Sequence, residues 1–415
     1  MKFYAPPPDK SMTIRALLLG AIARGTSRVD NPLLCEDTEA AVLCLKELGV
    51  KVRRGGNYFI IEGRGLKGLK EPARPLNAGE SGTLARLLAG ILAGQDFPSV
   101  ITGRGSLLNR PMAPLASALG KLGAGVRTTD GRLPLSIKPA KMKGRTISGV
   151  ESAQIKSALL LAGLYAEGRT KVKEKFPSRD HTERLLALLG ARITKKALFT
   201  GIEPGPLTAR RFTVPGDVSS AAPFIAAALL SGKELTIRNC GLNPSRLGFI
   251  RALQRMGARI ELKTSGAFPE PAGQLTVRPS ALKGSRVEPE EVPSMPDEIP
   301  LLAVVAAKAS GRTVLNGIAS LRTKESDRVE SAKALLRSLG VKNACGNGAM
   351  SITGPAAFKP VKPAETFSDH RIAMAAAAAS AACPGLGIRN PGCVNKSYPG
   401  FWKDFKKVFG PTFSF

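Results

Sequence analysis

The stretch DKSMTIRALLLGAIARG (residues 9–25) shows the pattern that decides the fold: a polar cluster, an apolar run and a closing glycine. A polar N-cap residue before such a run and a glycine after it mark the boundaries of a helix. The pattern recurs along the 415 residues, so we expect six helices of this kind. The other copies are ESGTLARLLAGILAG (80–94), SAQIKSALLLAGLYAEG (152–168), DVSSAAPFIAAALLSG (217–232), DEIPLLAVVAAKASG (297–311) and SDHRIAMAAAAASAACPG (368–385).

A second element lies between these copies. It is an amphipathic helix that ends in Leu-Gly or Met-Gly and is followed by short alternating strands. Together the two elements form a unit of the type β-α-β-α-β-β, used six times, with a degenerate last copy. The copies of the second element are LKELGVKVRR (45–54), LGKLGAGVRT (119–128), LLALLGARIT (185–194), LQRMGARIEL (253–262) and LLRSLGVKNA (335–344).

The spacing of the six units predicts two globular lobes. The closing glycines of the first element stand at 25, 94, 168, 232, 311 and 385, so the steps run from 64 to 79 residues. Steps of this size are too long for solenoid repeats, and six units fit two lobes of three. The widest step and the segment FTVPGDVSS (212–220) place the change of lobe near residue 215.

Several classes of protein are excluded by what the sequence lacks. Residues 1–9 contain no apolar segment of a signal peptide, and the apolar run 372–383 is too short to span a bilayer. We therefore expect a cytoplasmic chain without a membrane partner. The six cysteines form no CxxC pair, which predicts free thiols and no metal site. The sequence has no P-loop motif, and neither His181 nor His370 lies near a nucleophile elbow.

The starts of the six predicted helices carry residues suited to small anions. A helix N-terminus presents unpaired N–H groups and a partial positive charge, so several such ends brought together would form an anion site. Hydroxyl, amide and basic side chains at these ends match phosphate or carboxylate ligands better than an extended polymer. They include Lys10, Ser11, Arg15, Ser81, Thr83, Ser152, Gln154 and Arg371.

Charged residues gather at two further helix starts and at the start of the fifth copy. Arg110 precedes a helix, and RTKESDRVE (322–330) concentrates charges at a turn-to-helix junction. Asp297 opens a helix that is otherwise apolar. Carboxylates among bound anions would be repelled unless they handle protons, so Asp297 and Glu325 are acid/base candidates, with a helix-capping role as the alternative.

Nine motifs together resemble a known family. In chain order they are DKSMTIRALLLGAIARG, LNAGESGTLARLL, SLLNRPMAPL, SAQIKSALLLAGL, SRDHTERLL, MPDEIP, RTKESDR, SDHRIAMA and NKSYPGFW. In order and spacing they resemble the 5-enolpyruvylshikimate-3-phosphate synthase (3-phosphoshikimate 1-carboxyvinyltransferase) family of enolpyruvyl transferases. The resemblance implies an α/β fold: a two-lobed inside-out α/β barrel of six β-α-β-α-β-β repeats, three per lobe. The implied lobes are 9–214 and 1–8 plus 215–415, with a hinge near 8–9 and 214–216.

The resemblance implies a reaction as well as a fold. The enolpyruvyl group of phosphoenolpyruvate would pass to the 5-hydroxyl of shikimate 3-phosphate through a tetrahedral intermediate, with release of phosphate. The reaction belongs to chorismate and aromatic amino acid biosynthesis. It needs two small-molecule substrates and no cofactor, metal or nucleic acid, and closure of the lobes would exclude water. We expect a monomer.

The resemblance assigns roles to single positions. Asp297 would be the general base, and Glu325 would protonate the methylene of phosphoenolpyruvate, with Lys396 and Lys10 as rivals. Shikimate 3-phosphate would be held by Lys10, Ser11, Arg15, Ser152, Ala153, Gln154, Ser178, Asp297 and Lys324. Phosphoenolpyruvate would be held by Lys10, Gly82, Arg110, Gln154, Arg328, Arg371 and Lys396.

Some positions depart from the pattern of that family. Because a carboxylate beside an anionic substrate is unfavourable, we expect Glu80 to face a cation such as Arg110 or to leave the pocket. Gly82 keeps a small residue near the methylene of phosphoenolpyruvate, so we expect glyphosate to inhibit. The departures are Glu80 for Asn, Ala153 for Ser, His181 for Tyr, and Ser320 for Asn or Glu.

Two alternative functions come from different observations. UDP-N-acetylglucosamine 1-carboxyvinyltransferase shares the fold but uses a cysteine in the loop before the active-site arginine, and TGRGSLLNR (102–110) has none. A basic nucleic-acid-binding protein is suggested by 61 Lys and Arg against 32 Asp and Glu, a net charge of +29. Such a protein would carry basic runs interleaved with aromatic residues, whereas the cations here are scattered.

Overall fold

Both kinds of helix expected from the sequence are present in the computed structural model, which describes residues 2–346 and 348–415. The first kind comprises α1 (Lys10–Ile22), α3 (Gly82–Leu92), α5 (Ala153–Gly163), α7 (Val218–Ser231), α9 (Ile299–Ala306) and α11 (His370–Ser380). The second kind comprises α2 (Glu36–Glu47), α4 (Ala113–Gly120), α6 (His181–Leu188), α8 (Gly248–Arg255) and α10 (Arg328–Ser338). A further helix, α12 (Phe401–Phe409), follows near the C-terminus.

The glycines that follow the two kinds of helix differ in their position relative to the helix end. In the second kind of helix, the glycine lies just past the helix end with positive φ, between 74° and 95° at Gly49, Gly123, Gly190, Gly257 and Gly340, as expected. In the first kind, only Gly232 caps its helix, in the left-handed conformation at φ 63°. The expectation that the other five glycines close their helices was wrong. Those helices end earlier, and Gly25 already lies in the next strand.

Five sheets repeat one pairing scheme. Each starts with a strand that pairs in parallel with a second one, and the second continues through two antiparallel pairings. The orders are β13-β2-β4-β3, β5-β6-β8-β7, β9-β10-β12-β11, β1-β15-β17-β16 and β18-β19-β21-β20, with β14 also on β2. The sixth sheet contains only β22 (Leu386–Gly387) and β23 (Phe413–Ser414), in agreement with a degenerate last copy.

The strands of the first three sheets are β2 (Ala23–Asp30), β3 (Lys51–Arg54), β4 (Tyr58–Arg64), β5 (Leu76–Asn77), β6 (Ser99–Thr102), β7 (Gly125–Thr129), β8 (Arg132–Lys138), β9 (Thr146–Val150), β10 (Thr170–Glu174), β11 (Ile193–Lys196), β12 (Phe199–Ile202), β13 (Leu207–Thr208) and β14 (Arg211–Thr213). Those of the next two are β1 (Lys2–Tyr4), β15 (Leu235–Gly241), β16 (Arg259–Gly266), β17 (Ala272–Arg278), β18 (Arg286–Val287), β19 (Gly311–Leu315), β20 (Asn343–Gly346) and β21 (Ala349–Gly354).

The chain divides into two units. The N-terminal unit is Pro8–Val214, and the C-terminal unit combines Met1–Pro7 with Pro215–Phe415. Each unit has its own hydrophobic core, because one cluster of buried side chains lies within 12–214 and the other within 4 and 218–409. Strand β1 pairs in parallel with β15, so the first residues of the chain belong to the second core.

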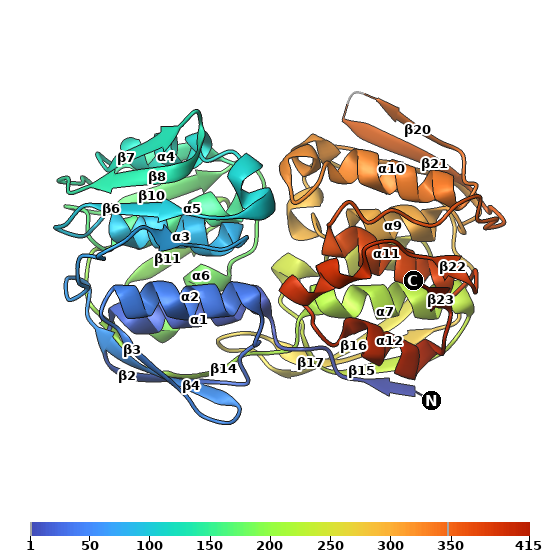
Figure 1. Ribbon diagram of the computed structural model, residues 1–415, viewed down its shortest axis with the longest axis horizontal. Helices are drawn as coiled ribbons and strands as arrows, with labels where there is room; N and C mark the ends of the chain where they lie inside the picture. The colour runs from blue at the N-terminus through green and yellow to red at the C-terminus, as the bar shows by residue number, and fades with distance from the viewer. Residues whose placement is uncertain (1, 347) are drawn as a thin grey trace. The chain divides into compact units, whose positions relative to one another are not determined.

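The first kind of helix lies in the interior of each unit. All residues of α9 and α11 are buried, and α7 is buried from Val218 to Leu229. Figure 1 shows α7, α9 and α11 stacked beside one another in the C-terminal unit, and contacts join α11 to both of the others. The second kind keeps an exposed face, as at Leu43 of α2, which is 52% exposed. The polar starts of the buried helices are thereby held on rigid supports.

Candidate functional site

The start of helix α1 carries three of the residues predicted to bind substrate. Asp9 caps the helix by accepting from the Met12 N–H at 2.8 Å, which fixes the position of Lys10. The Lys10 ammonium lies 2.8 Å from Asp37 at the start of α2, and its side chain remains 20% exposed. This acidic partner was not among the sequence-based candidates.

Arg15 is held in a network of hydroxyl groups. Its Nε donates to Thr182 Oγ1 at 2.8 Å and its terminal nitrogen to Ser11 Oγ at 2.7 Å. Thr182 in turn donates to Ser157 Oγ at 2.8 Å. Arg15 is 3% exposed, so these bonds from α1, α5 and α6 orient a charge that is almost removed from water. The structure thus brings Ser11 and Arg15 together, as the sequence predicts.

Gln154 links the starts of α5 and α3. Its amide oxygen accepts from Arg86 at 2.8 Å, and its amide nitrogen donates to Thr83 Oγ1 at 3.1 Å. Arg86 also donates to the carbonyl of Pro111 at 3.1 Å, next to Arg110. The network connects α3 and α5 with the loop that carries Arg110, a residue that the sequence predicts to bind phosphoenolpyruvate.

Gly82 lies where a side chain would collide with two guanidinium groups. A Cβ atom at this position would be 2.6 Å from a nitrogen of Arg110 and 2.6 Å from a nitrogen of Arg86. Both arginines are nearly buried, at 7% and 8% exposure. Two adjacent guanidinium groups beside a bare backbone form a suitable place for a planar oxyanion. The structure therefore places Gly82 and Arg110 together.

Ser178 contacts the end of β10, which the sequence did not indicate. It is buried, and both its N–H, at 3.1 Å, and its hydroxyl donate to Oε1 of Glu174. Ser152 is the N-cap of α5, and Ala153 is the first residue of that helix. These residues form the remaining part of the predicted group in the N-terminal unit.

The departures from the family pattern occupy different surroundings. Glu80 accepts from Ser106, from its hydroxyl at 2.7 Å and its N–H at 3.3 Å, in the loop before Arg110. His181 is buried at the start of α6, and Ser320 is exposed in the 3₁₀ turn Ile318–Thr323. Glu80 thus faces the loop that leads to Arg110.

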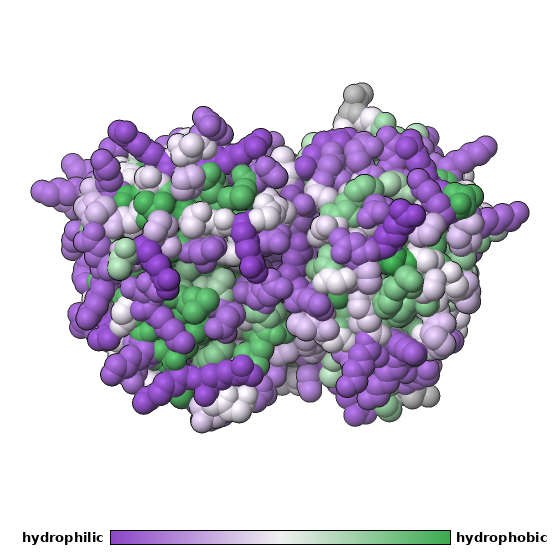
Figure 2. Space-filling model, viewed as in Figure 1, coloured by the Kyte–Doolittle hydropathy of each residue, from purple (hydrophilic) through white to green (hydrophobic). Residues whose placement is uncertain are grey.

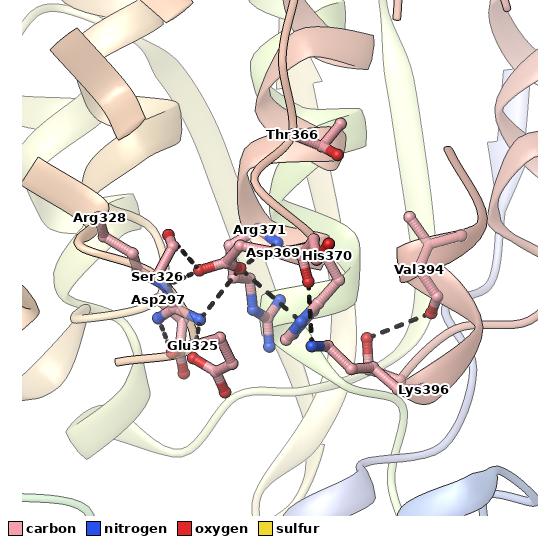
Figure 3. A network of polar contacts seen from close by, with 12 residues as sticks. Asp297, Glu325, Ser326, Arg328, Thr366, Asp369, His370, Arg371, Val394 and Lys396 are labelled. Atoms are coloured by element: carbon pink, nitrogen blue, oxygen red, sulfur yellow. Dashed lines mark hydrogen bonds and ion pairs between the residues drawn. The ribbon is translucent and has the colours of Figure 1, made fainter. Parts of the chain in front are cut away.

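The buried guanidinium of Arg328 organises the charged group of the C-terminal unit. It donates to Asp297 Oδ1 at 2.8 Å, to Glu325 Oε2 at 2.6 Å and to Asp369 Oδ2 at 2.9 Å. Figure 3 shows the three carboxylates converging on this arginine from separate elements. Arg328 and Asp369 are buried, whereas the side chains of Asp297 and Glu325 are 21% and 16% exposed. The two acid/base candidates are therefore neighbours and remain accessible.

The electrostatics of this group favour charge on the arginine. Burial by itself lowers the pKa of Arg328, but the carboxylates of Asp369, Glu325 and Asp297 outweigh that effect and raise the pKa well above its ordinary value. A buried cation needs such partners, because an unpaired charge in the interior costs several kcal/mol or more. Asp369 was missed as a site residue, although its place at the start of α11 marks it as an N-cap.

Arg371 and Lys396 flank the same start of α11. Arg371 donates from its guanidinium to the carbonyl of Ser219 at 3.0 Å and from its backbone to Asp369 at 2.9 Å. Lys396 donates to the carbonyl of Ser368 at 3.1 Å. Lys324, the residue before Glu325, is half-buried. The predicted residues of the C-terminal unit thus gather around α11 and the junction before α10.

The part of the chain that the structure describes contains neither a candidate metal site nor a helix that could span a membrane. Within residues 2–346 and 348–415, no group of three or more His, Cys, Asp or Glu side chains could hold a metal ion. Across the same residues, no helix has both the length and the apolar character needed to cross a membrane. The six cysteines are free thiols.

Comparison with known proteins identifies the family. A family model described as EPSP synthase (3-phosphoshikimate 1-carboxyvinyltransferase) matches residues 4–405. The 3-phosphoshikimate 1-carboxyvinyltransferase of Limosilactobacillus fermentum is 41% identical over 414 residues, covering 98% of this chain and 96% of its own. The protein of that name from a strain of Thermus thermophilus is 43% identical over 411 residues, covering 97% and 95%.

Solved structures agree with the sequence matches. The EPSP synthase of Acinetobacter baumannii matches with a TM-score of 0.83 at 36% identity, covering 98% of this chain and 95% of that one. The enolpyruvyl transferase NikO from Streptomyces tendae matches with a TM-score of 0.77 at 20% identity, covering 98% and 94%, and so shares the fold. The chain therefore belongs to the EPSP synthase family and has 3-phosphoshikimate 1-carboxyvinyltransferase activity (EC 2.5.1.19) in the shikimate pathway of aromatic amino acid biosynthesis.

Proposed function

We propose that the two units are the two lobes of an inside-out α/β barrel, each built from three β-α-β-α-β-β repeats. The repeated sheet order supports this proposal, as does the burial of α1, α3, α5, α7, α9 and α11 while their partner helices keep exposed faces. In a typical α/β protein the helices cover the sheets, whereas here helices fill the interior.

The N-terminal unit is proposed to bind shikimate 3-phosphate and one end of phosphoenolpyruvate. Arg15 offers an oriented cation, and the starts of α3 and α5 offer N–H groups and hydroxyls to phosphate. Arg110, beside Gly82, offers a fork for a carboxylate or phosphate. The residues assigned to this unit are Lys10, Ser11, Arg15, Gly82, Arg110, Ser152, Ala153, Gln154 and Ser178.

The C-terminal unit is proposed to supply the proton-transfer groups. Asp297 accepts the proton of the 5-hydroxyl of shikimate 3-phosphate, so that the oxygen attacks C2 of phosphoenolpyruvate while Glu325 protonates its methylene carbon. The tetrahedral adduct then loses phosphate as Glu325, left as a carboxylate by the first step, takes a proton from the new methyl group, which restores the double bond. Lys396, Arg371 and Arg328 stabilise the anionic groups of phosphoenolpyruvate, and Lys324 those of shikimate 3-phosphate.

The joint binding of Asp297 and Glu325 by Arg328 is the observation that carries these assignments. One guanidinium holds both carboxylates beside each other, and both keep part of their surface exposed. Paired carboxylates with separate roles in proton transfer need this kind of fixed, accessible placement. Arg328 acts as the positioning group between them.

Replacement of Asp297 tests the proposal. We expect Asp297→Asn to lower kcat by about 10²–10⁴-fold, the usual contribution of a general base, with a smaller change in the KM of either substrate. Phosphate release from phosphoenolpyruvate and shikimate 3-phosphate is the measurement. Asp327→Asn is a matched control, because Asp327 caps α10 and pairs with the exposed Arg322. Equal losses in the two variants would contradict the role of Asp297.

A further inference from the structure

The first residues of α5 include a fully buried lysine that the proposed reaction does not use. Lys156 is 0% exposed, in the first half of a helix that is apolar from Ala158 onward. Its ammonium lies 3.0 Å from Glu174 Oε2, at the end of β10, and 2.6 Å from Glu183 Oε1, in the first turn of α6. One cation therefore ties together three elements, each of which leads to a residue of the proposed substrate site.

The charge on this lysine is maintained by its partners. Burial by itself lowers the pKa of Lys156, but Glu183 and Glu174 outweigh burial and raise that pKa above its ordinary value. A charge in this position is costly unless it is paired and hydrogen-bonded on all sides. The arrangement of two carboxylates and one ammonium is more elaborate than core packing requires, since apolar side chains would fill the same space.

Glu174 uses its second oxygen for Ser178. Oε2 faces the lysine, while Oε1 accepts from both the N–H and the hydroxyl of Ser178. The carboxylate folds the loop 175–178 back on the end of β10. A register shift in the pairing of β9 and β10 between Lys173 and Glu174 marks the point where the strand gives way to this loop.

We propose that Glu174, held by Lys156, is a positioning residue for shikimate 3-phosphate: by accepting from both the N–H and the hydroxyl of Ser178, it orients the Ser178 oxygen to accept a hydrogen bond from a ring hydroxyl of this substrate. The inference rests on the proposed role of Ser178 and extends it to a residue that touches no substrate. Glu183 shares the lysine, and among the contacts that the structure describes none joins it to Ser178. The two glutamates therefore stabilise one cation, while only Glu174 acts on the binding loop.

Glu174→Gln separates positioning from packing. A carboxylate accepts hydrogen bonds on both oxygens, whereas a glutamine amide accepts on one and donates from the other side. With its oxygen retained by the ammonium of Lys156, the amide nitrogen faces the N–H of Ser178, which loses its acceptor. We expect the KM for shikimate 3-phosphate to rise at least tenfold, with the KM for phosphoenolpyruvate and kcat changed less than threefold.

Glu183→Gln is the matched control. It removes one charge from the same ammonium at similar burial, so the melting temperature should fall by a similar amount. The KM for shikimate 3-phosphate should change less than threefold. If both glutamine variants raise this KM equally, or if Glu174→Gln leaves it unchanged, the positioning role is wrong.

A double-mutant cycle with Ser178→Ala completes the test. Because Glu174 is proposed to act through Ser178, Glu174→Gln should raise the KM for shikimate 3-phosphate less than threefold when Ser178 is already alanine. Additive effects would contradict the inference while leaving the role of Ser178 intact. A Ser178→Ala enzyme with unchanged KM for shikimate 3-phosphate would instead overturn the role of Ser178, and the positioning inference with it.

Discussion

Gly82 lies between two guanidinium groups, and its lack of a side chain has a measurable consequence. A methyl group here would be 2.6 Å from nitrogens of Arg110 and Arg86, well inside van der Waals contact, so the arginines must move. We expect Gly82→Ala to raise the KM for phosphoenolpyruvate at least fivefold while the KM for shikimate 3-phosphate stays within twofold. Steady-state kinetics with each substrate varied in turn measure both values.

The control for this substitution is another helical glycine. A Cβ atom at Gly120, the last residue of α4, would meet nothing within 4 Å. Gly120→Ala should leave both KM values unchanged and stabilise the protein by up to about 1 kcal/mol, because alanine costs less backbone entropy in a helix. A loss of phosphoenolpyruvate affinity in both variants would show that the effect at Gly82 is not local.

Single residues of the candidate site could be proposed from the sequence where a motif carries them, but their hydrogen-bond partners could not. Polar residues at helix starts identified Ser11, Arg15 and Gln154. The pairing of Arg15 with Thr182 spans 167 positions, and no local pattern encodes such a contact. Lys156 could have been noticed, because a charged residue within an apolar helix is unusual unless it is paired.

At the scale of elements, the junction of α5, β10 and α6 depends on the charge of Lys156. Its pKa is raised in the folded protein, so its contribution to stability is complete below the ordinary lysine pKa of about 10.4 and is lost as pH rises through the higher folded value. Removing the lysine leaves two buried carboxylates unpaired, at a cost of about 3–5 kcal/mol.

Thermal unfolding of Lys156→Met at a series of pH values tests whether the pKa of Lys156 is raised in the folded protein. The gap in melting temperature from the wild type should stay constant between pH 7 and pH 9 and shrink only in strongly alkaline buffer, above about pH 10.4. A gap that narrows between pH 7 and pH 9 would mean that burial dominates and lowers the pKa of the lysine.

The existence of the helices was predictable, whereas their ends were only partly so. Leu-Gly and Met-Gly pairs marked the ends of the second kind correctly, since a glycine with positive φ reverses the chain there. The glycines of the first kind lie past the helix ends, because the helix stops with ordinary backbone angles and the glycine serves the turn into the next strand. Gly168, with positive φ, lies in such a turn, and Gly311, also with positive φ, is the first residue of β19.

For the whole molecule, the division into two cores predicts that one unit folds alone. The core of the N-terminal unit draws only on residues within 12–214, and β13 closes its first sheet by pairing with β2. We expect residues 8–214, expressed separately, to unfold cooperatively on heating, as circular dichroism would show. A non-cooperative transition would mean that this core depends on the rest of the chain.

The C-terminal unit behaves differently because it needs residues 1–7. The ring of Tyr4 stacks on Phe224 with centroids 3.8 Å apart, and its hydroxyl lies 2.8 Å from that of Tyr398. Loss of a buried aromatic side chain costs about 3–5 kcal/mol, so residues 215–415 alone should melt well below the same unit with residues 1–7 fused to it. Equal melting temperatures for the unit with and without residues 1–7 would contradict a stabilising role of this segment.

The scattered positions of the cations in the sequence suggest that the large positive charge belongs to the whole surface. Figure 2 shows hydrophilic side chains spread over both units on the viewed face. Within the site, the cations are matched locally, as Lys10 is by Asp37 and Arg328 by three carboxylates. The excess of 29 charges therefore adds a general attraction for anionic substrates and is not concentrated on one ligand.

The pairing of β1 with β15 also sets an order for biosynthesis. Tyr4 leaves the ribosome before its register partner Ile237, which is made 233 positions later. At roughly 5–20 residues per second, that delay lasts about 12–47 s. The N-terminal strand must stay unpaired while residues 8–214 are completed and fold. Strand β1 is thus synthesised before the N-terminal unit but can be placed in its sheet only after that unit is complete.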